Sequence, residues 1–352
     1  MLGLQLNADL PAGFDAVAQM VFKDRVSNEN RDNLEWLFLR YKPNRDWAVR
    51  AGRLGLDLYM LTEYRDVGYA YPWVRPVPEF YNLISSISRF DGVDVSYRTR
   101  LGSSIFEAKL AYGNTDANLQ GADQNIEIQL DDIKAVTLSL SGTDWLIRAA
   151  IAEACTTGVN SDSNQLLHAL RTLPQQLWPE ASAVADEIDF VDRTSHYYTL
   201  GGQYDDGTWL AQLELGYTET EWKLLQPYVS GYVSVGRRIE NFTLYGVISL
   251  IENTRKMPVL TPPASLPFLP PEQQNQLMGL FQAAQYSYGI SRLDQTSYSL
   301  GVRWDFYTDM ALKLQWDHSR IGEQGSSLWV RDMPMSHDNS VDLFSFNLSF
   351  IF

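Results

Sequence analysis

The side chains best suited to catalysis are few in this chain and lie far apart. It contains four histidines and one cysteine, Cys155. The stretch "WDHSR" places Asp317, His318 and Ser319 side by side, but successive residues of a strand point to opposite faces, so these three cannot form a catalytic triad. The chain lacks G-x-S-x-G, H-E-x-x-H and a phosphate-binding glycine loop. We therefore expect a protein that is not an enzyme, with no catalytic residue, metal site or cofactor.

A different set of charged side chains alternates with apolar residues. In "SYSLGVRWDF", Arg303 and Asp305 lie among Val302, Trp304 and Phe306. The stretches "TWLAQLELGY", "MALKLQWD" and "IFEAKLAY" repeat the pattern. In a β-strand this spacing puts the apolar side chains on one face and the charged ones on the other. The charged side chains expected on the polar face are Lys23, Arg50, Arg98, Arg100, Lys109, Arg148, Glu214, Arg303, Asp305 and Lys313.

Period-two stretches recur along the whole chain and predict an all-β protein of one domain, residues 1–352. We expect fifteen strands, at about 1–10, 14–26, 32–42, 46–58, 91–100, 103–113, 132–141, 143–155, 194–204, 208–219, 227–237, 241–252, 296–307, 310–320 and 341–352. Short turn signals such as "YDDGT" alternate with longer segments, at about 59–90, 114–131, 156–193, 254–295 and 320–339. Antiparallel strands produce this alternation when all tight turns lie at one end. The helical spacing in "SNQLLHALRT" and "PEQQNQLMGLFQAAQ" predicts helical segments within 156–193 and 254–295.

The composition is compatible with membrane strands but not with a membrane helix. No apolar run of about 18 residues occurs, which excludes a transmembrane helix. A spanning strand needs only about 9–11 residues, with apolar residues at alternate positions. Aromatic residues make up 12% of the chain and lie near both ends of the expected strands, which favours a membrane barrel over a soluble β-sandwich or propeller. The net charge of −15 argues against a nucleic-acid partner.

The chain ends in "DLFSFNLSFIF", which puts Phe344, Phe346, Leu348, Phe350 and Phe352 on one face of a strand. A closing strand that ends on Phe resembles that of Gram-negative outer-membrane β-barrels of the general porin type. The resemblance implies a transmembrane antiparallel barrel of about 16 strands in the bacterial outer membrane, with Phe352 read by the barrel-assembly machinery. It also implies short periplasmic turns, long extracellular loops, contacts with membrane lipids and lipopolysaccharide, and a homo-trimer.

The expected strand number is odd, whereas bacterial single-chain barrels have an even number. A barrel must also close so that no bare sheet edge faces lipid. We therefore expect one further strand, together with a signal peptide, to precede Met1. If one strand is miscounted, about 14 or 18 strands are the alternatives.

A porin-like barrel of this width implies a water-filled channel for passive diffusion of small polar solutes and ions. The charged set above would line the pore, with Arg98, Arg100 and Arg303 favouring anions, although each residue could equally pair within the wall. The stretch "EYRDVGYAYPWVRPVPEFY" within 59–90 is the candidate constriction loop. Its charged members are Arg65, Asp66, Arg75 and Glu79. The competing interpretation is an outer loop packed over the rim or into a subunit interface.

Two other functions stay open. The barrel could be a scaffold or sheath for a partner protein, or, less in keeping with the residues above, a barrel enzyme. The acidic stretch 180–192 carries enough carboxylates to bind Ca²⁺, but a solvated loop is the simpler interpretation.

Overall fold

The computed structural model describes residues 2–22, 33–84, 87–120, 125–160, 163–256, 258–264, 269–326, 328–329 and 339–351. These residues form a fifteen-stranded antiparallel sheet in which each strand pairs with its neighbours in sequence. The strands are β1 (Leu2–Asp9), β2 (Phe14–Phe22), β3 (Leu34–Tyr41), β4 (Trp47–Gly55), β5 (Arg89–Leu101), β6 (Ser104–Gln120), β7 (Asn125–Ser141), β8 (Trp145–Asn160), β9 (Arg193–Asp205), β10 (Trp209–Thr220), β11 (Tyr228–Ile239), β12 (Phe242–Asn253), β13 (Leu293–Tyr307), β14 (Met310–Ser326) and β15 (Asn339–Phe350).

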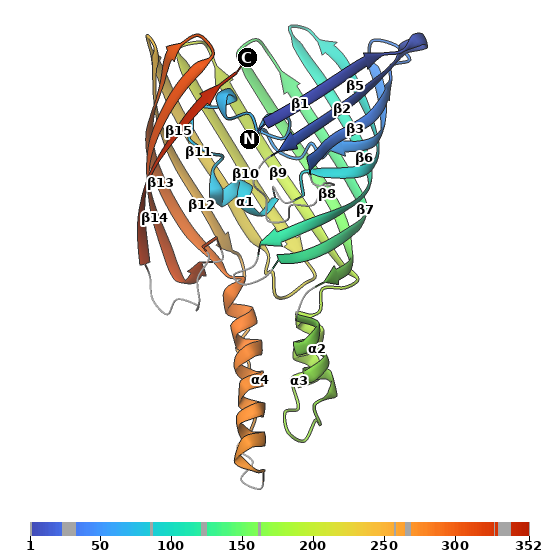
Figure 1. The fold of residues 1–352 in the computed structure, drawn as a ribbon, viewed down its shortest axis with the longest axis vertical. Coiled ribbons are helices and arrows are strands. Elements are labelled where there is room, and N and C mark those ends of the chain that lie inside the picture. Colours follow the sequence, from blue (N-terminus) through green and yellow to red (C-terminus); the bar gives the residue numbers. More distant parts are fainter. Residues whose placement is uncertain are drawn as a thin grey trace.

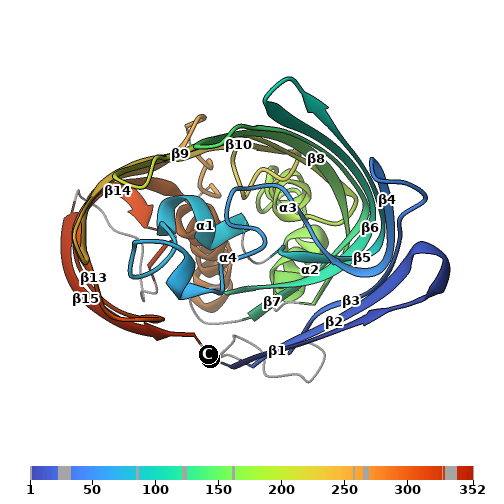
Figure 2. The ribbon, with the colours of Figure 1, turned by 90° about the horizontal axis from the view of Figure 1, so that it is seen from above.

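The sheet curls into a barrel (Figures 1 and 2), which confirms the expected all-β antiparallel barrel fold. In the part of the chain that the structure describes, β1 and β15 are the two edges, and the sheet is not closed. The expected strand before Met1 lies outside this chain and stays a prediction.

The two faces of the sheet have opposite character. On β10, Leu213 and Leu215 lie on the outer face and Leu215 is 55% exposed, whereas Glu214 between them is 0% exposed on the inner face. On β15, Phe344 and Phe346 are exposed outside, while Ser345 points inward. An exposed apolar belt therefore surrounds a polar interior, because successive side chains of a strand alternate between faces.

Tight turns connect the strands at one end of the barrel, the end at which β15 finishes (Figure 1). In the turn after β9, the Asp206 carboxylate accepts hydrogen bonds from the backbone N–H groups of Thr208 at 2.8 Å and Trp209 at 2.7 Å. Gly207 in this turn has a φ of 86°, a conformation that favours glycine. We call this end the short-turn end.

Residues 114–131, expected to be an irregular loop, are mostly strand. β6 and β7 continue as a hairpin in which Gln120 is the register partner of Asn125. The register shifts between Gly113 and Thr115, and Asp132 has a φ of 51°. These irregularities interrupt the period-two pattern of the sequence, and for this reason the pattern did not predict each of β6 and β7 as one continuous strand.

Three helices extend beyond the barrel at the other end (Figure 1). They are α2 (Ser163–Thr172), α3 (Ala181–Ile188) and α4 (Pro271–Ile290), and we call them the turret. On α4 the residues Leu277, Phe281, Ala284 and Tyr288 are buried in a core shared with α2 and α3. Their spacing of four, three and four residues defines one helix face. No helix in the described residues is long and apolar enough to cross a membrane.

Candidate functional site in the barrel interior

A long segment between β4 and β5 lies inside the ring of strands (Figure 2). This segment, which we call the inner loop, covers residues 56–84 and includes a 3₁₀ turn (Gly68–Ala70) and helix α1 (Pro78–Ile84). Its large rings Tyr59, Trp73 and Tyr81 are fully buried. They belong to one core cluster with wall residues such as Tyr232, whose ring centroid lies 5.5 Å from that of Trp73. The inner loop is therefore packed against the inner face of the barrel wall.

A buried cation on the wall holds the middle of the inner loop. Lys313 of β14 is 0% exposed, and its ammonium donates to the backbone carbonyls of Gly68, Tyr71 at 2.6 Å and Trp73 at 2.9 Å. The same Nζ lies 4.7 Å from the centroid of the Tyr71 ring. An ammonium has three N–H groups, so these three carbonyls satisfy it completely. Removing it would leave carbonyls without partners in a buried place.

A buried acid on the wall holds both ends of the inner loop. Glu214 of β10 accepts hydrogen bonds from the backbone N–H of Met60 at 2.7 Å and from the hydroxyls of Tyr81 and Tyr232, the latter at 2.7 Å. Met60 and Tyr81 belong to the loop and lie twenty-one positions apart in the sequence. One carboxylate therefore ties the start of the loop to helix α1.

A buried carboxylate of the inner loop is bound by side chains of the barrel wall. Glu79 of α1 is 2% exposed and accepts from Ser249 at 2.8 Å, from the side-chain amide of Gln295 at 2.6 Å, and from Ser297. These donors come from β12 and β13. Short polar side chains on neighbouring strands thus form a cradle for one carboxylate, which satisfies the buried charge with hydrogen bonds.

Two arginines add one ion pair and further hydrogen bonds to this attachment. Arg75 of the loop lies 2.6 Å from Asp317 and donates to Ser345 at 2.8 Å. Arg303 of β13 lies 2.8 Å from Asp305 and donates to the backbone carbonyl of Tyr69 at 2.7 Å. Both guanidinium groups have direct partners, so they fasten the loop to β13, β14 and β15.

The start of the inner loop is held by two cations of the opposite wall. Asp57 lies 2.7 Å from Lys109 and 2.8 Å from Arg148. Burial opposes ionisation of this carboxylate, but the two cations outweigh burial and lower the pKa of Asp57. Arg148 also donates to the backbone carbonyl of Tyr59 at 3.0 Å. Asp57 did not emerge from the sequence, because it lay in an expected strand at a position of uncertain parity.

The remaining sequence-predicted residues are not gathered under the loop. Arg50 pairs with Asp94 at 2.9 Å on the inner face of β4 and β5. Arg98 and Arg100 are exposed on the same face of β5, and neither has an ion pair among the described residues. In the loop itself, Arg65 donates to the Tyr59 hydroxyl at 2.9 Å and lies 3.8 Å from Asp66. Lys23 and Phe352 lie outside the described residues.

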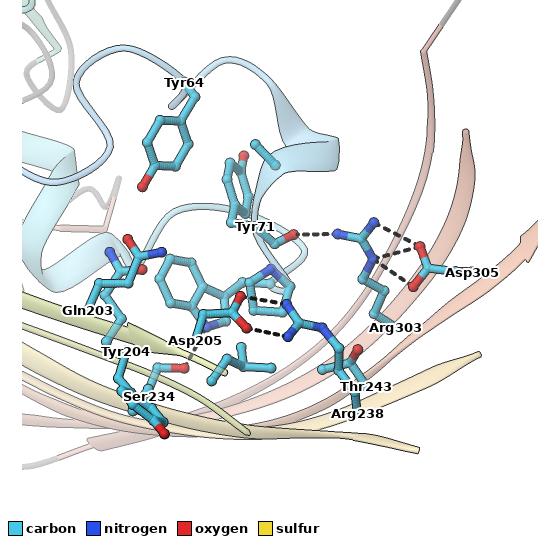
Figure 3. Close-up of a pocket in the computed structure, with 16 residues that line it drawn as sticks. Tyr64, Tyr71, Gln203, Tyr204, Asp205, Ser234, Arg238, Thr243, Arg303 and Asp305 are labelled. Atoms are coloured by element: carbon cyan, nitrogen blue, oxygen red, sulfur yellow. Dashed lines mark hydrogen bonds and ion pairs between the residues drawn. The ribbon is translucent and has the colours of Figure 1, made fainter. Parts of the chain in front are cut away.

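A cavity of about 170 Å³ lies between the inner loop and the wall near the short-turn end (Figure 3). Two arginine–aspartate pairs line it, Arg238 with Asp205 and Arg303 with Asp305. Tyr64 of the loop and Gln203 of β9 line its other side. The Arg238–Asp205 pair was not expected from the sequence, because the strands were expected to end at 204 and 237, whereas β9 ends at Asp205 and β11 at Ile239.

The acidic stretch 180–192 forms ion pairs with basic residues of α2 and of the β10–β11 connection. Asp186 and Asp189 lie 3.2 and 2.6 Å from Arg171, and Glu187 lies 2.5 Å from Lys223. No group of three or more His, Cys, Asp or Glu side chains that could hold a metal ion occurs in the described part of the chain.

The chain matches no known protein family and no curated protein in sequence. Among solved structures, OmpT of Vibrio cholerae in its trimer form is similar with a TM-score of 0.52 and 13% identity, covering 99% of this chain and 89% of that one. OmpF of Salmonella typhi, in complex with daunomycin, has a TM-score of 0.53 and 11% identity over 98% of this chain and 88% of its own. An anion-selective porin from Comamonas acidovorans has a TM-score of 0.53 and 12% identity with the same coverage. The chain therefore has the fold of bacterial outer-membrane β-barrels of the porin type.

Proposed function

We propose that this protein is a bacterial outer-membrane channel through which small polar solutes and ions diffuse passively. The observation that carries the proposal is the inner loop, which lies inside the barrel and is anchored to the wall by buried charges such as Lys313, Glu214 and Glu79. A barrel of this width leaves an aqueous interior. A loop held across such an interior narrows it, and Arg98 and Arg100 on the inner face of β5 are exposed.

The outer surface supports a location in a lipid bilayer. Leu6 and Phe346 are both 77% exposed on the outer face. Near the short-turn end, Trp304 stacks on Phe242 with ring centroids 5.8 Å apart. Aliphatic side chains between aromatic ones are typical of a barrel wall that contacts hydrocarbon and the membrane interface. In this proposal lipids and lipopolysaccharide contact this wall, the short turns are periplasmic and the turret is extracellular.

We propose that the loop constricts the pore and that Arg98 and Arg100 set its ion preference. Both are exposed on the inner face and have no ion pair among the described residues. Their positive charges raise the local concentration of anions in the lumen. Arg303 contributes less to the ion preference, because its guanidinium is bound by Asp305 and by the backbone carbonyl of Tyr69 and helps to hold the loop. Arg75 and Glu79 likewise hold the loop in this proposal.

The assembly proposed here is a homo-trimer whose Phe352 is read by the barrel-assembly machinery. OmpT of Vibrio cholerae in its trimer form has the same fold, which supports this assembly. Sedimentation of the detergent-solubilised protein measures the subunit number, and a monomer under conditions in which the barrel is folded would contradict it.

Planar bilayer recordings test the channel. We expect purified, folded protein to produce stepwise conductance with weak voltage dependence. Folded protein that gives no conductance in repeated insertions would instead favour a scaffold or sheath for a partner protein. Hydrolase activity that survives purification and is lost on a single side-chain change would favour a barrel enzyme.

A further inference from the structure

The cavity near the short-turn end is lined by two arginine–aspartate pairs (Figure 3). Arg238 binds Asp205 through two parallel hydrogen bonds of 2.5 and 2.7 Å. Arg303 binds Asp305 through its Nε at 3.0 Å and its Nη2 at 2.8 Å. The cavity wall therefore presents two positive and two negative groups, with no net charge from these four residues.

The strand register explains why the two pairs meet at one cavity. Arg238 of β11 and Arg303 of β13 are both register partners of Thr243 on β12, the strand between them. The three side chains therefore project from one level of the inner face, and all three line the cavity. Asp205 ends β9 and Asp305 lies two residues after Arg303, so each acid lies beside its arginine.

The opposite side of the cavity offers uncharged hydrogen-bonding groups. The hydroxyl of Tyr64 points toward Gln203, and both side chains line the cavity (Figure 3). Neither side chain has a hydrogen bond to another described residue. Burial raises the pKa of Tyr64 to about 12, so this hydroxyl is protonated at neutral pH and can donate. A ligand in the cavity would therefore meet both charged pairs and free donors and acceptors.

We propose that this cavity binds compact zwitterions, namely free α-amino acids with small side chains, as they pass through the channel. The inference rests on the proposed function and names a solute class for it. A simple anion or cation meets groups of both signs here and gains little. A zwitterion can offer its carboxylate to the guanidinium groups and its ammonium to the aspartates at the same time, so each wall charge keeps a partner.

The size of the cavity limits the solute. Its volume is about 170 Å³. Pockets for drug-sized ligands are larger, about 300–1,000 Å³. Glycine and alanine are therefore the amino acids that fit this volume. We expect weak, millimolar binding, because the charged groups of the wall are already paired with one another and the solute must replace those ion pairs.

Saturation-transfer NMR on the full chain in detergent micelles at neutral pH tests the inference with glycine as the probe. We expect saturable glycine binding, with acetate, methylammonium and glycerol at least tenfold weaker. The double variant Arg238→Gln/Asp205→Asn keeps the net charge and should weaken glycine binding at least tenfold. Its matched control, Lys134→Gln/Glu153→Gln, removes an ion pair of 3.0 Å on the outer face and should leave binding unchanged.

Two results would overturn the inference: glycine affinity unchanged in the double variant, or acetate alone binding as tightly as glycine. If the double variant does not fold, Tyr64→Phe decides, with about a threefold loss expected and an unchanged affinity counting against the cavity. Conductance of the same samples separates this question from the channel itself. A conducting protein that does not bind glycine refutes the cavity alone, whereas glycine binding without conductance refutes the channel.

Discussion

The ammonium of Lys313 on β14 donates to the backbone carbonyl of Trp73 in the inner loop at 2.9 Å, although 240 residues separate the two in sequence. The indole of Trp73 in turn donates to Ser234 of β11 at 2.8 Å. One loop residue thus bonds two strands of the wall. The position of the loop, and with it the shape of any channel, depends on contacts of this long-range kind.

Loss of the Lys313 charge should loosen the inner loop. In Lys313→Met the side chain keeps much of its apolar volume, but the carbonyls of Tyr71 and Trp73 lose a charged donor. Hydrogen bonds to charged groups contribute roughly 1.5–3 kcal/mol each. We expect a folded barrel with noisier single-channel currents and a lower urea midpoint. Lys134→Met, an exposed outer residue, is the control, and equal current noise in the two variants would refute the anchoring role.

The ion preference should follow the two exposed arginines of β5. Reversing both, in Arg98→Glu/Arg100→Glu, should move the zero-current potential in a salt gradient toward cation selectivity, with a several-fold change in the permeability ratio. Arg303→Gln should change it much less, because Asp305 already neutralises that guanidinium. Lys256→Glu, an exposed rim residue, serves as the control for a charge change outside the lumen. An unchanged potential in the double variant would show that both arginines are wall residues only.

The turret should depend on its own core and not on the barrel. Phe281 of α4 packs edge-on against Trp178, with ring centroids 5.6 Å apart. Phe281→Ala should remove about 3–5 kcal/mol of packing and expose the amides of α4 to hydrogen exchange. Met278→Ala, three residues earlier on the exposed side of the helix, should change exchange little. Conductance should persist in both variants, and unaltered α4 exchange in Phe281→Ala would contradict the packing argument.

The turret should also loosen in acid. Burial opposes the charge of Glu187, but hydrogen bonds from Lys223 at 2.5 Å and Tyr288 at 2.6 Å outweigh it and lower the pKa of Glu187. A carboxylate with a lowered folded-state pKa stabilises the fold above its unfolded value, about 4.3, and loses this contribution as the pH falls through the folded value. We expect exchange protection of α4 to fall several-fold in this range, after correction for intrinsic rates.

The matched variant for the acid response is Glu187→Gln, which keeps the side-chain shape. Its protection should be lower at neutral pH and should change less with acid. A smaller response should remain, because Arg171 lowers the pKa of Asp189 against the effect of its burial and gives a second contribution of the same sign. The same pH response in both proteins would exclude Glu187 as its source.

Strand number and inner-face parity were accessible from residue patterns, with limits that have physical causes. Glu214 and Lys313 were both expected on the polar face, where they lie. Their burial under the inner loop was not predictable, because the covering residues belong to a segment far away in the sequence. The hairpin extension of β6 and β7 was missed at its bulges, where the alternation is interrupted near Asp132.

The sequence by itself determined which side chains lie on the outer surface and which face the interior, because that choice depends only on the alternation of neighbouring residues in a strand. The tertiary structure alone decided which of the inner charges are free. Arg98 remains exposed, whereas Arg303 is engaged by Asp305 and the inner loop, although both are arginines at equivalent positions in the alternation. The difference comes from where a loop of β4–β5 docks on strands more than 150 residues away, and no local pattern encodes that docking.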